Sequence, residues 1–386
     1  MAGGGGDHGG RRHSCVRIFP AGRARPRDRS LALVGMAIWR RTGRLHQSLT
    51  RDPRLIGVLC AAALIGCGPP ASPPAVRGSA TLPVPTGSVD GIARVGKSVV
   101  VGVLNAGSHA FEVWVVDEDG SNLRQLAFPA DPLCQRTDYL YPREFGRDGV
   151  SVTKACSVPP PVMGFSASYS AAQLTLVDGG VKVISAPQHD HNPGAISWDP
   201  VGRKGIAATG DGSCETLIWV TDSGVQPVEM TLTAGNLTWN LASAFQDTWD
   251  AQGLAAWPAW SPDGLTIAFV ASLDAIGHHG LDRARQPWTL YTMDPSTLSP
   301  RVIATGLGQP RDLHWASDGN HLAFSGSIRS GEAGTWTTTL DGRMSRVTSD
   351  QARYLTWGSD GSTLLMAVPH PSAGVPDADE MQLVRF

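Results

Sequence analysis

The stretch Trp260-Ser261-Pro262-Asp263-Gly264 decides the fold, together with the apolar residues 265–270 that follow it. Pro, Asp and Gly in this order form a tight turn, because Gly readily takes a positive φ and the Asp side chain caps the turn backbone. The apolar run after the turn predicts a β-strand. The aromatic residue before the turn is expected to be buried.

Six copies of this unit follow one another along the chain. The large apolar residues are Ile92, Phe145, Trp198, Trp260, Trp315 and Trp357, and the glycines four residues later are Gly96, Gly149, Gly202, Gly264, Gly319 and Gly361. The glycines are 53, 53, 62, 55 and 42 residues apart. Self-similarity at such a spacing is typical of repeat architectures.

A second element recurs after each turn except the last: an apolar strand that ends in an acid and another turn. The acids are Asp117, Asp178, Asp222, Asp294 and Asp341. A further strand follows each acid, so a unit has about four short strands. Antiparallel sheets repeated radially form a β-propeller. We therefore predict an all-β fold, a six-bladed β-propeller of four-stranded antiparallel blades over residues 88–386.

The ends of the chain suggest how the ring closes. Only two strands follow Gly361, and the second, at residues 381–386, stands where the other units have the strand before their acid. The sixth blade therefore lacks its outer strand. Residues 79–84 are expected to supply it, since prolines are tolerated at a sheet edge.

The units resemble the repeat of TolB-type propellers, in which an apolar strand, an Asp-Gly turn and a short strand precede Trp-Ser-Pro-Asp-Gly. Residues 113–128 and 257–272 carry this pattern, and the resemblance covers roughly residues 80–386. It implies a propeller fold and is weak evidence for any function.

The N-terminal part indicates export. Residues 1–35 are rich in Gly, Arg and His without apolar periodicity, and are either not translated, with synthesis starting at Met36, or a disordered extension. Residues 36–66 combine arginines with the uncharged run 55–66, which is too short to span a membrane and fits a signal peptide.

Leu64-Ile65-Gly66-Cys67 resembles the lipobox of bacterial lipoproteins. The resemblance implies cleavage after Gly66 and acylation of Cys67, which would anchor the protein to the cell surface or the periplasmic face. The alternative is that Cys67 is simply an apolar residue of the signal peptide. Residues 67–87 are rich in Pro, Ser and Ala and fit a tether leading to the closing strand.

Charge argues against nucleic acid as a partner. Residues 1–66 hold 12 arginines and three acids, whereas residues 67–386 carry a net charge of −11. An acidic body repels phosphate.

Catalytic motifs give little support for an enzyme. No Gly-x-Ser-x-Gly elbow occurs in the chain. His189, Asp190 and His191 could offer two histidines to a metal, although an ordinary polar turn explains the same residues and no third ligand can be assigned. Cys134 and Cys156 flank the second repeat turn, 22 residues apart, and are the favoured disulfide pair in an exported domain.

The longest interval between repeats contains an insertion at residues 235–257, with Trp239, Trp249 and Trp257. Long propeller loops often bind partners, so these tryptophans mark a candidate binding loop, while packing against the disc is the alternative. We predict a lipid-anchored, non-catalytic module without a cofactor, which binds an envelope protein or polymer. The alternative function is a metal-dependent enzyme, a hydrolase or lyase of a glycan or lactone, that uses channel residues.

Overall fold

The computed structural model describes residues 76–127, 136–146, 149–158, 166–174, 181–188, 195–210, 215–242, 253–273, 286–328, 331–370, 375 and 377–386. The chain divides into residues 1–71 and 72–386, and the described residues all belong to the second unit. They form the strands β1 to β25, and their ladders are antiparallel. The predicted all-β class is therefore confirmed.

Three sheets of four strands contain the first repeats and the last one. The first has β2 (Gly87–Val95), β3 (Ser98–Asn105), β4 (Phe111–Asp117) and β5 (Arg124–Leu126). The second has β6 (Arg136–Phe145), β7 (Gly149–Val158), β8 (Ser166–Leu174) and β9 (Val181–Gln188). The last has β23 (Tyr354–Trp357), β24 (Thr363–Pro369), β25 (Asp379–Arg385) and β1 (Gly78–Leu82).

The central repeats are arranged differently. A four-stranded sheet holds β10 (Ser197–Trp198), β11 (Gly205–Gly210), β12 (Glu215–Thr221) and β13 (Gly224–Pro227). A seven-stranded sheet holds β16 (Leu254–Trp260), β17 (Ile267–Ser272), β18 (Pro287–Asp294), β19 (Ser299–Trp315), β20 (His321–Ser327), β21 (Ala333–Thr339) and β22 (Met344–Thr348). Two separate four-stranded sheets were expected here. They share β19, because its 17 residues stay extended and pair first with β18 and then with β20.

The N-terminal strand β1 lies beside β25, with Gly78 opposite Arg385 and Leu82 opposite Met381. β1 thus forms the outer edge of the sheet that contains the last repeat.

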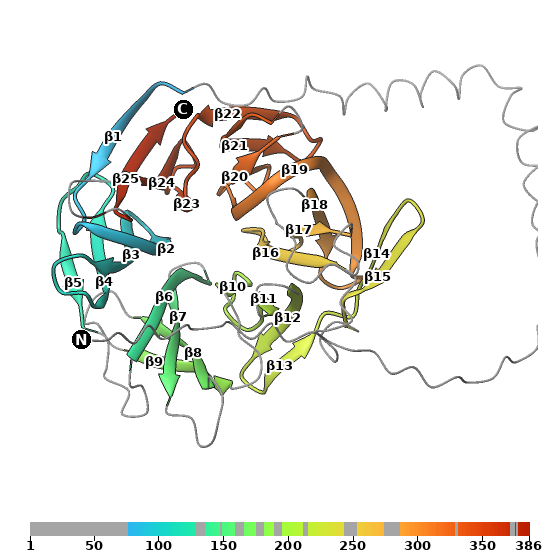
Figure 1. Ribbon diagram of the computed structural model, residues 1–386, viewed down its shortest axis with the longest axis horizontal. Helices are drawn as coiled ribbons and strands as arrows, with labels where there is room; N and C mark the ends of the chain where they lie inside the picture. Colours follow the sequence, from blue (N-terminus) through green and yellow to red (C-terminus); the bar gives the residue numbers. More distant parts are fainter. Residues whose placement is uncertain are drawn as a thin grey trace, which may run out of the picture. The chain divides into compact units, whose positions relative to one another are not determined.

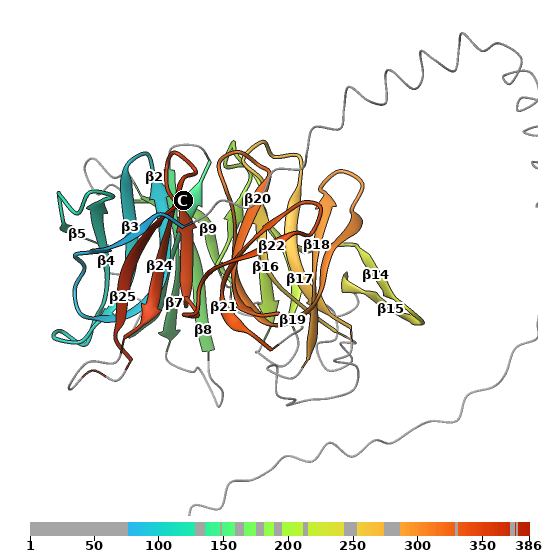
Figure 2. The same ribbon diagram turned by 90° about the horizontal axis from the view of Figure 1, so that it is seen from above.

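Figure 1 shows the sheets arranged around a common centre, with β2, β6, β10, β16, β19 and β23 innermost. Each inner strand contacts the next in this order, and β23 contacts β2. Figure 2 shows the same sheets from the side. Both views show a separate hairpin, β14 (Thr231–Ala234) with β15 (Leu237–Asn240), that projects outward. The sequence had suggested a loop there.

The core lies between neighbouring sheets rather than at the centre. Val100 and Val115 of the first sheet pack against Val150 and Val152 of β7. Strands such as β3 are buried on both faces, because each sheet has a neighbour on either side. The inner strands therefore surround the centre, and their side chains determine what the centre can bind.

Candidate functional site: two cavities at the centre of the ring

The repeat turns form as the sequence predicts. In the turn after β16, Asp263 Oδ1 accepts hydrogen bonds from the Ser261 hydroxyl (2.6 Å) and the Leu265 amide (2.9 Å). These bonds, the serine hydroxyl first, lower the pKa of Asp263. Five turn glycines have φ between 56° and 72°: Gly96, Gly202, Gly264, Gly319 and Gly361. The turns are therefore rigid local structures that fix the ends of the inner strands.

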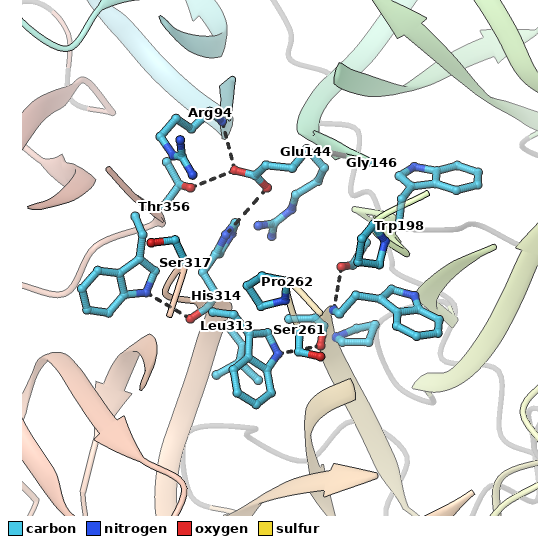
Figure 3. A pocket seen from close by; sticks show the side chains of 18 residues that line it. Arg94, Glu144, Gly146, Trp198, Ser261, Pro262, Leu313, His314, Ser317 and Thr356 are labelled. Carbon is cyan, nitrogen blue, oxygen red and sulfur yellow. Dashed lines mark hydrogen bonds and ion pairs between the residues drawn. The ribbon is translucent and has the colours of Figure 1, made fainter. Parts of the chain in front are cut away.

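A cavity of about 350 Å³, which we call the Trp-turn cavity, lies at this end of the inner strands (Figure 3). All six inner strands line it, through Arg94, Glu144, Trp198, Trp260, Trp315 and Trp357. The site thus depends on every repeat, and no single segment of sequence encodes it.

Three of the repeat tryptophans hold neighbouring repeats together. The indole N–H of Trp315 donates to the Ala259 carbonyl (3.0 Å), and that of Trp357 donates to the His314 carbonyl (3.3 Å). The indole N–H of Trp198 donates to the Ser151 hydroxyl (2.9 Å). Each bond crosses to an adjacent repeat, so these tryptophans build the wall of the cavity.

Below this cavity a buried ion pair crosses the centre of the ring. Arg143 of β6 pairs with Asp312 of β19, which also accepts a hydrogen bond from the Leu355 amide of β23. Asp312 is 1% exposed, and this burial raises its pKa, while Arg143 opposes the rise. Residues 169 positions apart in the chain are thereby tied together.

Glu144 and His314 complete the polar cluster. One Glu144 carboxylate oxygen accepts from the Arg94 amide (3.0 Å) and the Thr356 hydroxyl (2.8 Å), and the other is 3.9 Å from His314 Nδ1 (Figure 3). Burial, followed by the charge of Arg143, holds the pKa of His314 well below its ordinary value. The imidazole is therefore neutral at pH 7, and Glu144 acts mainly as an acceptor that joins β2, β6 and β23.

A second cavity, of about 340 Å³, lies farther along five of the same inner strands. We call it the Asp90 cavity. Asp90 lies in β2, Tyr141 in β6, Trp257 in β16, and Tyr354 in β23. Residues 309–311 of β19 also line it. The polar cluster around Arg143 therefore lies between two cavities.

The carboxyl group of Asp90 is exceptional among the described side chains. The Leu140 backbone hydrogen-bonds it, but the Oδ2 atom is buried and has no hydrogen-bond partner among the described residues. Burial raises the pKa of Asp90 to about 7, and the nearby Asp379 carboxylate adds to the rise, while Arg353 opposes it. This carboxyl group consequently changes charge close to neutral pH.

Irregular backbone brings these side chains to the centre. The ladders shift register around Asp90, around Trp257 and between Arg311 and His314. Trp257, Gln309 and Asp312 have positive φ values of 52°, 44° and 50°. Bulges redirect side chains, and positive φ in non-glycine residues costs about 1–3 kcal/mol, so such strain is commonly found at functional sites.

Two of the turns beside the Trp-turn cavity carry exposed apolar side chains. Val201 and Leu265 are 68% and 69% exposed, and the prolines Pro200 and Pro262 of the same two turns line the cavity. The turns lie close together, since a Cβ atom on Gly264 would be 3.0 Å from Pro200 Cδ. We call Pro200, Val201, Pro262 and Leu265 the apolar rim.

The tryptophans of the predicted binding loop have different places. Trp239 is 1% exposed and packs in the core with Leu232 and Phe269, so the packing alternative describes it. Trp257 is half-buried and lines the Asp90 cavity. Trp249 lies outside the described residues.

The remaining predicted site residues are not tested by the structure. Cys67, Cys134, His189, Asp190 and His191 lie outside the described residues. Cys156 lies in β7, and only its backbone is described. Within the described ranges, no three or more His, Cys, Asp or Glu side chains are grouped to hold a metal ion. No described helix is long and apolar enough to cross a bilayer.

No protein-family model matches the chain, and no curated protein matches its sequence significantly. Among solved structures, TolB from Acinetobacter baumannii is similar at 14% identity and a TM-score of 0.48, over 75% of this chain and 63% of TolB. A putative glucose dehydrogenase from Thermus thermophilus is similar at 13% identity and a TM-score of 0.48, over 80% of this chain and all of that one. An oligogalacturonate lyase in complex with manganese is similar at 12% identity and a TM-score of 0.41, over 75% of this chain and 86% of the lyase. The chain spans less than two thirds of TolB, and these similarities concern the fold alone.

Proposed function

We propose that the domain is a six-bladed propeller, closed by β1, that works as a non-catalytic binding module for an envelope protein or polymer. The cyclic contacts of the six inner strands and the pairing of β1 with β25 support the ring. Sharing β19 between two repeats does not break this scheme, because its two halves pair with different neighbours.

The observation that carries the binding role is the apolar rim beside the Trp-turn cavity. Two large aliphatic side chains more than two thirds exposed are costly to keep in water, and contiguous apolar surface marks interaction sites. The rim stands on rigid turns, so a partner meets a preformed surface. The Glu144 carboxylate beneath it is already hydrogen-bonded to β2 and β23. A macromolecular segment with apolar side chains therefore fits this end of the ring.

The test is affinity capture from envelope extract with the purified domain, residues 68–386, as bait. The variant Val201→Asp/Leu265→Asp places two charges on the apolar rim. The matched control Leu123→Asp/Val302→Asp places two charges on exposed apolar residues, 41% and 51% exposed, that line neither cavity. A partner retained by the wild type and the control but lost by the rim variant supports the proposal. Equal capture by the rim variant contradicts it.

The anchoring is proposed from the sequence alone. Acylation of Cys67 would hold the protein on the membrane, since each buried CH₂ contributes about 0.8 kcal/mol. The variant Cys67→Ser should therefore appear in the soluble fraction, whereas the wild type stays with the membranes. A Cys67→Ser protein that remains membrane-bound would disprove the lipoprotein assignment.

The alternative, a metal-dependent enzyme acting on a glycan or lactone, makes a different prediction. Purified domain would then carry a stoichiometric metal ion, and chelation would remove an activity without removing a partner. Metal analysis of the same preparation used for capture separates the two functions.

A further inference from the structure

We infer that the Asp90 cavity binds a small organic cation through an ammonium group. This site lies at the opposite end of the polar cluster from the apolar rim and is independent of the binding role proposed there. Its essential parts are one carboxylate and an aromatic wall, supplied by different repeats.

The carboxylate of Asp90 forms no ion pair with a described side chain, although Arg311 and Arg353 line the same cavity and the charge of Arg353 opposes the rise of its pKa. Its buried Oδ2 atom has no hydrogen-bond partner among the described residues. Burying an unpaired acceptor is costly, and native proteins rarely do so without a functional reason. A bound ammonium group would place a positive charge beside this oxygen, which attracts it without a protein partner.

The two arginines that line the cavity, Arg311 and Arg353, do not pair with Asp90. Arg353 is held by Asp379 (3.2 Å) and donates to the Ser88 hydroxyl (3.0 Å). Its charge is therefore largely balanced by a carboxylate whose side chain is fully buried. Arg311 is exposed at the rim, where solvent screens its charge.

Aromatic rings make up much of the remaining wall. Tyr141, Trp257, Trp288 and Tyr354 all line the cavity. The rings of Tyr141 and Tyr354 lie 6.0 Å apart at 50°, with their hydroxyls hydrogen-bonded to each other. Ring faces attract cations, and aromatic cages are a common way to bind ammonium groups. The volume of about 340 Å³ suits a small ligand.

The backbone gives independent support. Asp90 lies at a register shift of β2, and Trp257 has a φ of 52° at a register shift of β16. Two inner strands thus depart from regular geometry where they present the carboxylate and the indole to the same cavity. Strain of this kind persists where the surrounding structure holds a site in place.

Isothermal titration of the purified full chain with tetramethylammonium tests the inference, with tert-butanol as a neutral ligand of similar shape. We expect tetramethylammonium to bind at pH 8 and tert-butanol not to bind. The groups that face Asp90 are Asp379, Arg353, Tyr141 and Tyr354. Because Asp90 must be charged to attract the ligand, the affinity should rise between pH 6 and pH 8.

Two variants distinguish binding from folding. Asp90→Asn keeps the shape and removes the charge, so it should weaken binding at pH 8 by about tenfold or more, the change expected for one lost charge contact. The control Asp377→Asn removes an exposed carboxylate 3.8 Å from Arg353 and should bind like the wild type. Equal affinity of wild type and Asp90→Asn, equal binding of tert-butanol, or no binding of tetramethylammonium at pH 8 would each overturn the inference. None of these outcomes would affect capture at the apolar rim.

Discussion

The Trp-turn cavity and the Asp90 cavity are nearly equal in volume and lie along the same strands, but their carboxylates differ in hydrogen bonding. Around the first cavity, Glu144 accepts two hydrogen bonds and three indole N–H groups are bonded across repeats. In the second, a buried carboxylate oxygen has no partner among the described residues. The carboxylate of the first cavity is therefore held by bonds between strands, while that of the second keeps an unsatisfied oxygen that a ligand can satisfy.

The largest expected effect concerns the ion pair between the two cavities. Arg143→Met should lower the free energy of unfolding by about 3–5 kcal/mol, because it leaves the Asp312 carboxylate buried without its partner. Urea denaturation of the purified domain at pH 7 measures the change.

The double variant Arg143→Met/Asp312→Asn should recover much of that loss, since no charge is left unpaired and Asn tolerates the positive φ of residue 312. The single variants Arg143→Met and Asp312→Asn should each lose some free energy of unfolding. If the loss in the double variant equals the sum of these two losses, Arg143 and Asp312 do not act as a pair.

The second expected effect is a pH-dependent change in the free energy of unfolding, caused by Asp90. The pKa of Asp90 is about 7 in the folded protein and ordinarily 3.8, so the folded state binds the proton more tightly than the unfolded state. The wild type should therefore lose stability as the pH rises from about 4 to about 7. The loss is at most on the order of 4 kcal/mol, at 1.36 kcal/mol for each tenfold difference in proton affinity.

Asp90→Asn removes this dependence, so it should be more stable than the wild type at pH 8 and close to it at pH 4. Denaturation curves at several pH values provide the measurement, with Asp377→Asn as the exposed control. Parallel stability profiles for wild type and Asp90→Asn would show that the carboxyl group titrates normally.

A smaller effect compares two tryptophans of the Trp-turn cavity. Trp315 donates to the Ala259 carbonyl, whereas the buried Nε1 of Trp260 has no hydrogen-bond partner among the described residues. Both Trp→Phe changes remove similar apolar volume, but only Trp315→Phe leaves an acceptor without its donor. Trp315→Phe should therefore cost about 1 kcal/mol more than Trp260→Phe in thermal or chemical unfolding. Equal losses would mean that the bond between the repeats adds no net stability.

Some features of the fold could be predicted from the sequence and others could not. The turns and the burial of Ile92, Trp198, Trp315 and Trp357 were predictable, because each depends on residues close together in the chain, whereas Phe145 and Trp260 are only half-buried. Sharing of β19 by two repeats was not predicted, since nothing in residues 299–315 marks the point where one ladder ends and the next begins.

The contacts at the centre depend on tertiary structure and could not be predicted from spacing. Arg143 and Asp312 are 169 positions apart, and the bulges that turn Asp90 and Trp257 inward leave no local motif. One signal was present in the sequence: Asp90, Arg143 and Asp312 are charged residues two or three positions before Ile92, Phe145 and Trp315, inside strands that are otherwise mostly apolar. Aligning the repeats on their aromatic residues would have indicated these positions.

The smallest expected effect is the absence of coupling between the two ends. Val201 and Leu265 are more than two thirds exposed, so the rim variant Val201→Asp/Leu265→Asp should change stability by no more than about 0.5 kcal/mol for each substitution. The rim variant should bind tetramethylammonium like the wild type, and Asp90→Asn should capture the same macromolecular partner as the wild type. The cluster of Arg143, Glu144 and Asp312 separates the cavities, and its fixed bonds give neither ligand a second arrangement to select. If tetramethylammonium changes the affinity for the partner, this cluster has two arrangements, and the two cavities form one coupled site.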